Sequence, residues 1–247
     1  MGDLCTKKLE KYGTFNTYDL FKNIAFFAMV IDHIGYYFLP YNQLLRLVGR
    51  VSMLIFAVLY GISYKSNKSP HTILFFALIT AIPMTFLEDM PLPLNCLFNF
   101  YISWFLVDGF ENIYKNNYVL FCIFLVLMIP AAFLSNIIIE YGVSFVALMF
   151  CGKIFAKEKK TRRDILTTMI IFVLYTVYQS LNFGFNLYYM DVLLIVNSII
   201  YAFMLDFKIR PIKNFIGNNI LSLISRTTLG LYTTHITIMI IVKKWLF

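Results

Sequence analysis

Residues 20–35, LFKNIAFFAMVIDHIG, form a long apolar run that carries a lysine near its start and an Asp-His pair near its end. At about 100° and 1.5 Å per residue, the steps from Lys22 to His33 return an α-helix to almost the same azimuth, roughly 16 Å deeper. Ionisable side chains inside a membrane span cost several kcal/mol unless they face a polar cavity or a partner. The run therefore predicts a spanning helix with one functional face, although a pair that only packs helices would also keep Asp32 and His33 there.

The composition extends this prediction to the whole chain. Apolar residues make up 60% of the 247 positions and charged residues 14%, which is more hydrophobic surface than a soluble domain can bury. The apolar runs continue to Phe247 without a polar stretch long enough for a separate soluble domain. We therefore predict an all-α, polytopic helical bundle that forms one integral membrane domain over residues 1–247. The four cysteines are scattered and show no metal-ligand spacing, so no metal is expected.

Nine runs of about twenty residues are apolar enough to span a bilayer. They are Leu20–Leu39, Gln43–Tyr64, His71–Leu87, Leu92–Val107, Tyr118–Leu134, Ile137–Ala156, Ile165–Leu181, Leu187–Leu205 and Leu229–Phe247. The connections between them are short and carry turn-forming residues, such as Pro40 and the stretches at 88–93 and 182–186.

The basic residues predict the orientation. A cytoplasmic N-terminal segment at 1–19 places 17 of the 21 lysines and arginines inside, which satisfies the positive-inside rule and makes a nucleic-acid partner unnecessary. Nine spans would leave Lys243 and Lys244 outside. Either the C-terminus is external, or the segment at 207–227, predicted to lie in the membrane interface, adds a re-entrant or crossing piece.

Two arginines in the second span are the next unusual feature. Arg46 and Arg50 lie one helical turn apart, so both guanidinium groups point the same way. Counted from the outer surface, Arg50 lies at about the depth of His33, so the two helices can bring these groups together. Asp32 is about 100° around the helix from His33, and we expect it to bind an arginine or hold the acceptor.

Two later spans each add one ionisable group. Glu140 lies in the outer half of the sixth span, where neutralising an arginine and taking part in catalysis are both open roles. His235 lies in the last span with Tyr232 on the same helix face. A histidine there either bonds to a backbone carbonyl or takes part in chemistry.

The arrangement suits acyl transfer from a cytosolic donor. A histidine desolvated among apolar helices stays neutral near pH 7 and is then able to take a proton from an attacking amine or hydroxyl. A cation at Lys22 suits a polyanionic donor. Coenzyme A carries its phosphates at one end and its thioester at the other, with an arm of the order of the distance from Lys22 to His33.

Several stretches resemble the TraX family of membrane proteins. LFKNIAFFAMVIDHIG and LLRLVGRVSMLIFAVLYGISY match its lysine, its Ile-Asp-His-Ile-Gly signature and its Arg-x-x-Gly-Arg helix. ALITAIPMTF, IIEYGVSFVAL and LGLYTTH resemble its later motifs, with Glu140 in place of an aspartate and Thr233 in place of a proline. The Lys22-to-His33 pattern is also similar to the wider transmembrane acyltransferase group, including acyltransferase family 3.

The resemblance implies a function. TraX-like proteins are associated with N-acetylation of the N-terminus of pilin, in the inner membrane of bacteria, which implies acetyl-CoA as donor and a peptide, pilin-like or glycan acceptor outside. It implies that His33 is the catalytic histidine and that the other catalytic residues are Asp32, Glu140 and His235. It also implies that the donor is bound by Lys22, Arg46, Arg50 and Tyr232. Two alternatives stay open: a proton-coupled secondary transporter, which would use the same buried groups as a relay, and a non-catalytic membrane assembly factor.

Overall fold

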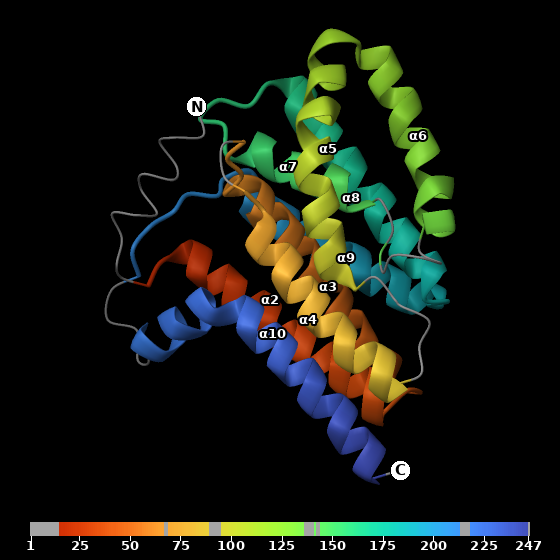
Figure 1. The fold of residues 1–247 in the computed structure, drawn as a ribbon. Helices are drawn as coiled ribbons and strands as arrows, with labels where there is room; N and C mark the ends of the chain where they lie inside the picture. The colour runs from red at the N-terminus through yellow and green to blue at the C-terminus, as the bar shows by residue number, and fades with distance from the viewer. Residues whose placement is uncertain are drawn as a thin grey trace.

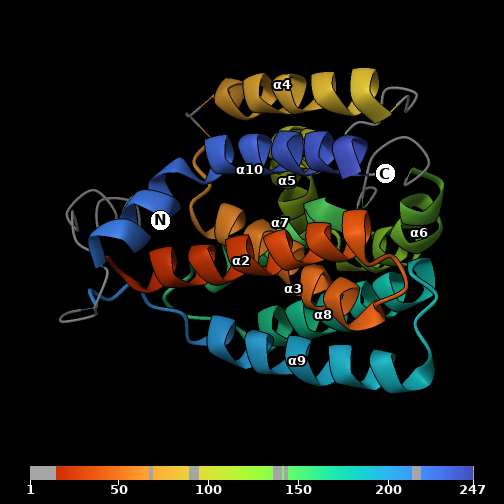
Figure 2. The same cartoon turned by 90° about the horizontal axis from the view of Figure 1, so that it is seen from below.

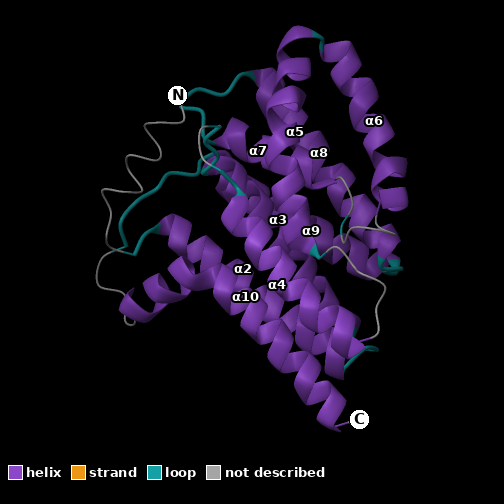
Figure 3. Ribbon diagram, viewed as in Figure 1, coloured by secondary structure: helices purple, strands orange, loops and turns teal. Residues whose placement is uncertain are grey.

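The regular structure of the described residues is entirely α-helical. The computed structural model describes residues 15–66, 69–88, 95–135, 141, 144–212 and 218–246, and these contain nine helices (Figures 1 and 3). They are α2 (Thr17–Phe38), α3 (Gln43–Ile62), α4 (His71–Glu88), α5 (Cys96–Asn116), α6 (Tyr118–Ser135), α7 (Ser144–Phe155), α8 (Arg162–Asn182), α9 (Leu187–Leu205) and α10 (Asn218–Leu246). An isolated β-bridge between Asn16 and Pro211 ties the start of α2 to the segment after α9.

Local sequence explains where most of these helices begin. Asn16 caps α2 and Thr161 caps α8, each in a capping box completed by an aspartate three residues later. Asn42, Asn95 and Asn186 cap α3, α5 and α9 through their side-chain oxygens. These caps satisfy backbone N–H groups that the first turn of a helix leaves without partners.

The helices are stacked so that α2 and α3 lie near the middle. Viewed from below, α4 is outermost on one side, followed by α10 and then α2, and α9 is outermost on the other side beyond α8 (Figure 2). α2 packs against both α3 and α10, α3 packs against α7, and α8 packs against α9. The three elements that carry the predicted site residues, α2, α3 and α10, are therefore neighbours.

The helix bounds agree with most of the predicted spans and correct three of them. α7 begins at Ser144 rather than at Ile137, and Tyr141 before it lies in a turn. α5 ends at Asn116 rather than at Val107, and its added turns carry Asp108, Glu111 and Lys115. α10 begins at Asn218 rather than at Leu229, because the polar segment before the predicted span continues the same helix. At about 1.5 Å per residue this 29-residue helix is roughly 43 Å long, more than the hydrocarbon core of a bilayer.

The end of α10 bears on the position of the last two lysines. The Lys243 ammonium lies 5.3 Å from the ring centroid of Tyr37, near the end of α2. α10 thus runs parallel to α2 and ends beside the α2–α3 turn (Figure 1). Residues 218–226 belong to α10 itself, and the side of the membrane on which α10 ends stays a prediction.

Several helices are suited to a membrane. α3, α6, α8 and α9 are long and apolar enough to cross one, and the shorter runs His71–Phe86 and Ser144–Phe155 are also apolar. α6 and α9 carry many exposed apolar side chains, including Val119, Val126, Ile195 and Phe203. Such surface is stable against lipid and costly in water, so the chain is a helical membrane protein.

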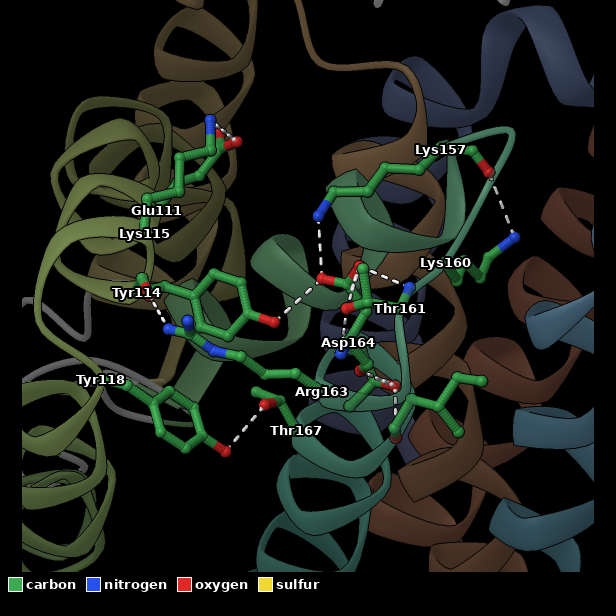
Figure 4. A network of polar contacts seen from close by, with 12 residues as sticks. Glu111, Tyr114, Lys115, Tyr118, Lys157, Lys160, Thr161, Arg163, Asp164 and Thr167 are labelled. Atoms are coloured by element: carbon green, nitrogen blue, oxygen red, sulfur yellow. Dashed lines mark hydrogen bonds and ion pairs between the residues drawn. The ribbon is translucent and has the colours of Figure 1, made fainter.

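The end of the bundle where α5, α7 and α8 meet is held by a polar network (Figure 4). The Asp164 carboxylate accepts from the Tyr114 hydroxyl at 2.9 Å and pairs with Lys157 at 2.8 Å. The Arg163 guanidinium lies between the rings of Tyr114 and Tyr118, at 4.2 and 4.0 Å from their centroids. This network fixes the basic α7–α8 connection, which is the most strongly charged part of the predicted cytoplasmic side.

Two glycines allow α3 and α7 to cross at very short range. A Cβ at Gly61 would lie 1.9 Å from the Met149 carbonyl oxygen, and one at Gly152 would lie 2.1 Å from the Val58 carbonyl oxygen. Close approach of this kind is the usual role of small residues between membrane helices.

We expect Gly152→Ala to destabilise the fold, because the methyl group must push the two backbones apart. The expected loss in unfolding free energy is about 1–3 kcal/mol, the usual cost of overpacking, measured by denaturant titration in detergent. Gly109→Ala in α5 is the matched control, since a Cβ there meets nothing within 4 Å. Equal stability of the two variants would contradict the crossing.

Candidate functional site

The centre of the candidate site is a pair of histidines from α2 and α10. Nδ1 of His33 in α2 lies 2.7 Å from Nε2 of His235 in α10. Nδ1 of His235 lies 2.9 Å from the carbonyl oxygen of Leu231, one turn earlier in α10. Both roles proposed for His235 from the sequence are thus compatible: one ring nitrogen meets a backbone carbonyl and the other meets His33.

Aromatic rings surround this pair. The ring of Tyr232 lies 6.3 Å from that of His33 and 5.7 Å from that of His235, between centroids. Tyr37 contacts His33 on α2 itself, and Phe26 contacts His235 edge-on at 6.0 Å. His33 and His235 are both half-buried, so the pair lies in a mostly apolar surrounding that leaves both histidines partly accessible.

Asp32 meets the two arginines of α3. Its carboxylate lies 2.7 Å from Nη1 of Arg46 and forms an ion pair with Nη2 of Arg50. Asp32 is 3% and Arg50 1% exposed, whereas the Arg46 side chain keeps 17% of its surface exposed. The sequence placed Arg50 at the depth of His33, and the structure brings it to the neighbouring residue Asp32.

Aromatic rings also cover Arg50. Its guanidinium carbon lies 3.9 Å from the ring centroid of Phe183 and 4.9 Å from that of Tyr141. Arg46 lies 5.3 Å from the same Phe183 ring. Cation–π contacts of this kind strengthen when the groups are withdrawn from water. The α8–α9 connection, predicted only as a turn, therefore supplies part of the arginine site.

Gly49 explains how the aspartate fits between the arginines. A Cβ at this position would lie 2.1 Å from the Cβ and Cγ atoms of Asp32. Only glycine lets α2 and α3 approach closely enough for the Asp32 carboxylate to reach Arg46 and Arg50. The glycine in the sequence RLVGR thus has a direct steric role that arginine spacing alone did not reveal.

Lys22 lies at the other end of the same pair of helices. Its Nζ donates to the carbonyl oxygen of Ser225 at 2.5 Å, and Asp19 accepts from the Ser225 hydroxyl at 2.6 Å. Asn23 donates to the Leu221 carbonyl at 2.8 Å. The first two turns of α2 are thus fastened to the first half of α10.

A cavity of about 180 Å³ connects the surroundings of Lys22 with those of the histidine pair. Its wall is formed by α2, α3, α4, α5 and α10, with Tyr18 and Lys22 near one end and Met29 and Tyr232 near the other. The wall is mostly apolar. Cys96 also lines it and donates from its thiol to the Tyr232 hydroxyl at 3.1 Å.

The structure thus gathers most of the predicted residues into two clusters. His33 and His235 lie together with Tyr232, which lines the cavity, and Asp32 joins Arg46 and Arg50 beside them. Glu140 lies outside the described residues. Sequence reasoning missed Gly49, Phe183 and Cys96, and the only signal for any of them was the glycine between the two arginines.

The fold and the site define a polytopic helical membrane protein. Its α2, α3 and α10 helices carry a histidine pair, an aspartate paired with two arginines, and a cavity with a lysine at one end. The chain belongs to the TraX family. The family described as "TraX protein" matches residues 17–243, which include every described residue of the site.

The chain also resembles a bacterial protein in sequence. The chain is 32% identical over 158 residues to a protein of Rickettsia prowazekii (strain Madrid E) that is named only as uncharacterized. The match covers 64% of this chain, and it spans only 62% of the length of that relative. No solved structure matches the chain.

Proposed function

We propose that this protein is a membrane-embedded acetyltransferase that moves an acetyl group from cytosolic acetyl-CoA to an amine or hydroxyl of an extracytoplasmic acceptor. The observation that supports this most directly is the cavity, which leads from the Lys22 end to Tyr232, whose ring contacts both histidines. Family membership is consistent with it.

The donor would enter from the Lys22 end. In this proposal the phosphates of acetyl-CoA bind near Lys22, and the pantetheine arm follows the apolar wall toward Tyr232. Lys22 now bonds to the Ser225 carbonyl, so the incoming phosphate would compete with a neutral partner for the ammonium. A charge-assisted hydrogen bond to phosphate is stronger than one to a carbonyl.

His33 would act as general base at the far end. It takes the proton from the acceptor N–H or O–H while the acceptor atom attacks the thioester carbon. The C–S bond then breaks, and the proton passes to the departing CoA thiolate, so the products are the acetylated acceptor and free CoA. Arg46, the more accessible arginine, would orient the acceptor or stabilise the oxyanion, with Asp32 and Arg50 holding it in place.

The topology follows the same proposal. Nine crossings with a cytoplasmic N-terminus, in the inner membrane of a bacterium, would place the basic α7–α8 connection inside and the α2–α3 turn outside. The acceptor, a peptide N-terminus or a glycan, would then reach His33 from the outer side. A catalytic role for Glu140 remains part of this proposal on the basis of its sequence position alone.

We expect Lys22→Met to weaken acetyl-CoA binding by about 10- to 100-fold, the effect of losing one hydrogen bond to a charged group. Methionine keeps most of the aliphatic stem, so the cavity wall changes little. The measurement is equilibrium binding of acetyl-CoA to the purified protein in detergent, by calorimetry.

Lys65→Met is the matched control, because Lys65 follows α3 at the same end of the bundle and does not line the cavity. It should bind acetyl-CoA like the wild type. Wild-type protein that binds no acetyl-CoA, or a Lys22→Met variant that binds it normally, would contradict the proposal.

A further inference from the structure

A backbone carbonyl group of α10 fixes which atom donates in each hydrogen bond of the histidine pair. The Leu231 carbonyl oxygen can only accept, so the ring nitrogen 2.9 Å from it, Nδ1 of His235, must carry a hydrogen. A neutral imidazole carries one N–H. Nε2 of neutral His235 is therefore an acceptor.

The same reasoning applies to the imidazole ring of His33. Because Nε2 of His235 accepts, Nδ1 of His33, 2.7 Å away, must be the donor. Nε2 of His33 is then the nitrogen with a free lone pair, and it makes no hydrogen bond with any described residue. Leu231 thus determines, through His235, which tautomer His33 adopts.

We infer that His235 is a positioning residue that holds His33 in the tautomer able to act as a base. In the other tautomer Nε2 of His33 would carry a hydrogen and could not accept a proton. The catalytic meaning of this inference rests on the proposed acyl transfer, whereas the tautomer itself is a property of the resting protein.

The histidine pair can also share the proton that His33 takes from the acceptor. When Nε2 of His33 accepts the proton of the acceptor, His33 becomes an imidazolium whose Nδ1–H still points at His235. Transfer of that hydrogen to Nε2 of His235 moves the charge to the second ring, where Nδ1–H remains bonded to the Leu231 carbonyl. The reverse movement returns that hydrogen to Nδ1 of His33 and restores the His33 imidazolium, which then gives its Nε2 proton to the departing thiolate, so no proton is gained or lost.

The surroundings favour such sharing. Phe26, Tyr37 and Tyr232 pack on the two rings, so much of the surface that would surround a cation there is aromatic. Charge is costly in such a site unless a hydrogen-bond partner spreads it. His235 and the Leu231 carbonyl form that partner chain.

The chain offers a direct test because it contains only three histidines, His33, His71 and His235. Protein labelled with ¹⁵N in histidine would be studied by solid-state NMR in lipid vesicles at neutral pH. Unprotonated imidazole nitrogens resonate far downfield of protonated ones. We expect His33 and His235 both to show a protonated Nδ1 and an unprotonated Nε2, whereas the exposed His71 at the start of α4 serves as reference.

Variants separate positioning from packing. His235→Leu removes the acceptor, and we expect the His33 tautomer to change and kcat to fall by at least about 100-fold with an unaltered KM for acetyl-CoA. Loss of the group that fixes the histidine tautomer costs about 10⁴-fold in serine proteases. His235→Gln retains an amide oxygen that can accept from Nδ1 of His33, so it should restore both the tautomer and part of the rate.

Two results would overturn the inference. One is a wild-type spectrum in which Nε2 of His33 carries a hydrogen. The other is a His235→Leu variant whose His33 signals are unchanged. Failure of the acyl-transfer proposal would look different: the expected tautomers would be present, but the wild-type protein would transfer no acetyl group.

Discussion

If the protein has the proposed acetyltransferase activity, we expect His33→Ala to lower the rate of acetyl transfer by about 10²–10⁴-fold and to leave acetyl-CoA binding unchanged, as removal of a general base should. Binding persists because Lys22 and the cavity wall near it are not altered. The measurement uses purified protein in vesicles, ¹⁴C-acetyl-CoA and an envelope extract from cells that lack the protein, and it counts label transferred to the extract.

The control and the contrary outcome are both accessible. His71→Ala changes an exposed histidine at the start of α4 and should keep full activity. Thermal unfolding of both variants separates loss of chemistry from loss of fold. Full transfer by His33→Ala would exclude His33 as the base. A wild-type protein that transfers no label would favour a non-catalytic role. Substrate flux without acetyl-CoA would favour a transporter.

Asp32→Asn is the substitution expected to destabilise the fold most, by about 3–5 kcal/mol. It preserves the volume of the side chain but leaves the buried Arg50 and the partly buried Arg46 without the carboxylate that pairs with both. Uncompensated buried charge is the reason for the large cost. Denaturant titration of the purified protein in detergent, followed by far-UV circular dichroism, measures it.

Two comparisons make this result specific. Asp191→Asn alters an exposed aspartate of α9 and should change stability little. Arg46→Met removes only one of the two cations and leaves Asp32 paired with Arg50, so its loss should be smaller. If Asp32→Asn proves as stable as Asp191→Asn, the Asp32–Arg50 pair does not hold α2 and α3 together.

The sequence was sufficient to predict helices and individual ionisable residues, and insufficient to predict their partners. Apolar run length locates α3, α6 and α9 well, because a membrane helix must satisfy its own backbone. It failed at the ends of α5 and α10, where polar turns continue the helix. Hydropathy reports the apolar part of a helix and not its full length.

Long-range pairing was less predictable. The spacing of Arg46 and Arg50 identified a common direction, yet nothing local indicated that Phe183, at the end of α8, would cover them. His235 was a candidate by its type and depth alone. Its contact with His33 depends on how α10 packs against α2, which one sequence does not encode in any local pattern.

Two of the contacts between α2 and α10 restrict where residues can be inserted or deleted. Lys22 meets Ser225 and His33 meets His235, so the partners advance by almost equal steps along two parallel helices. Eleven residues correspond to three turns at about 3.67 residues per turn, close to the natural α-helical pitch, so the same faces stay opposed with little supercoiling. One residue inserted between Ser225 and His235 would rotate the second imidazole by about 100° and abolish only the deeper contact. Insertions and deletions should therefore be tolerated before Leu221 or after His235 far better than in the roughly four turns between them.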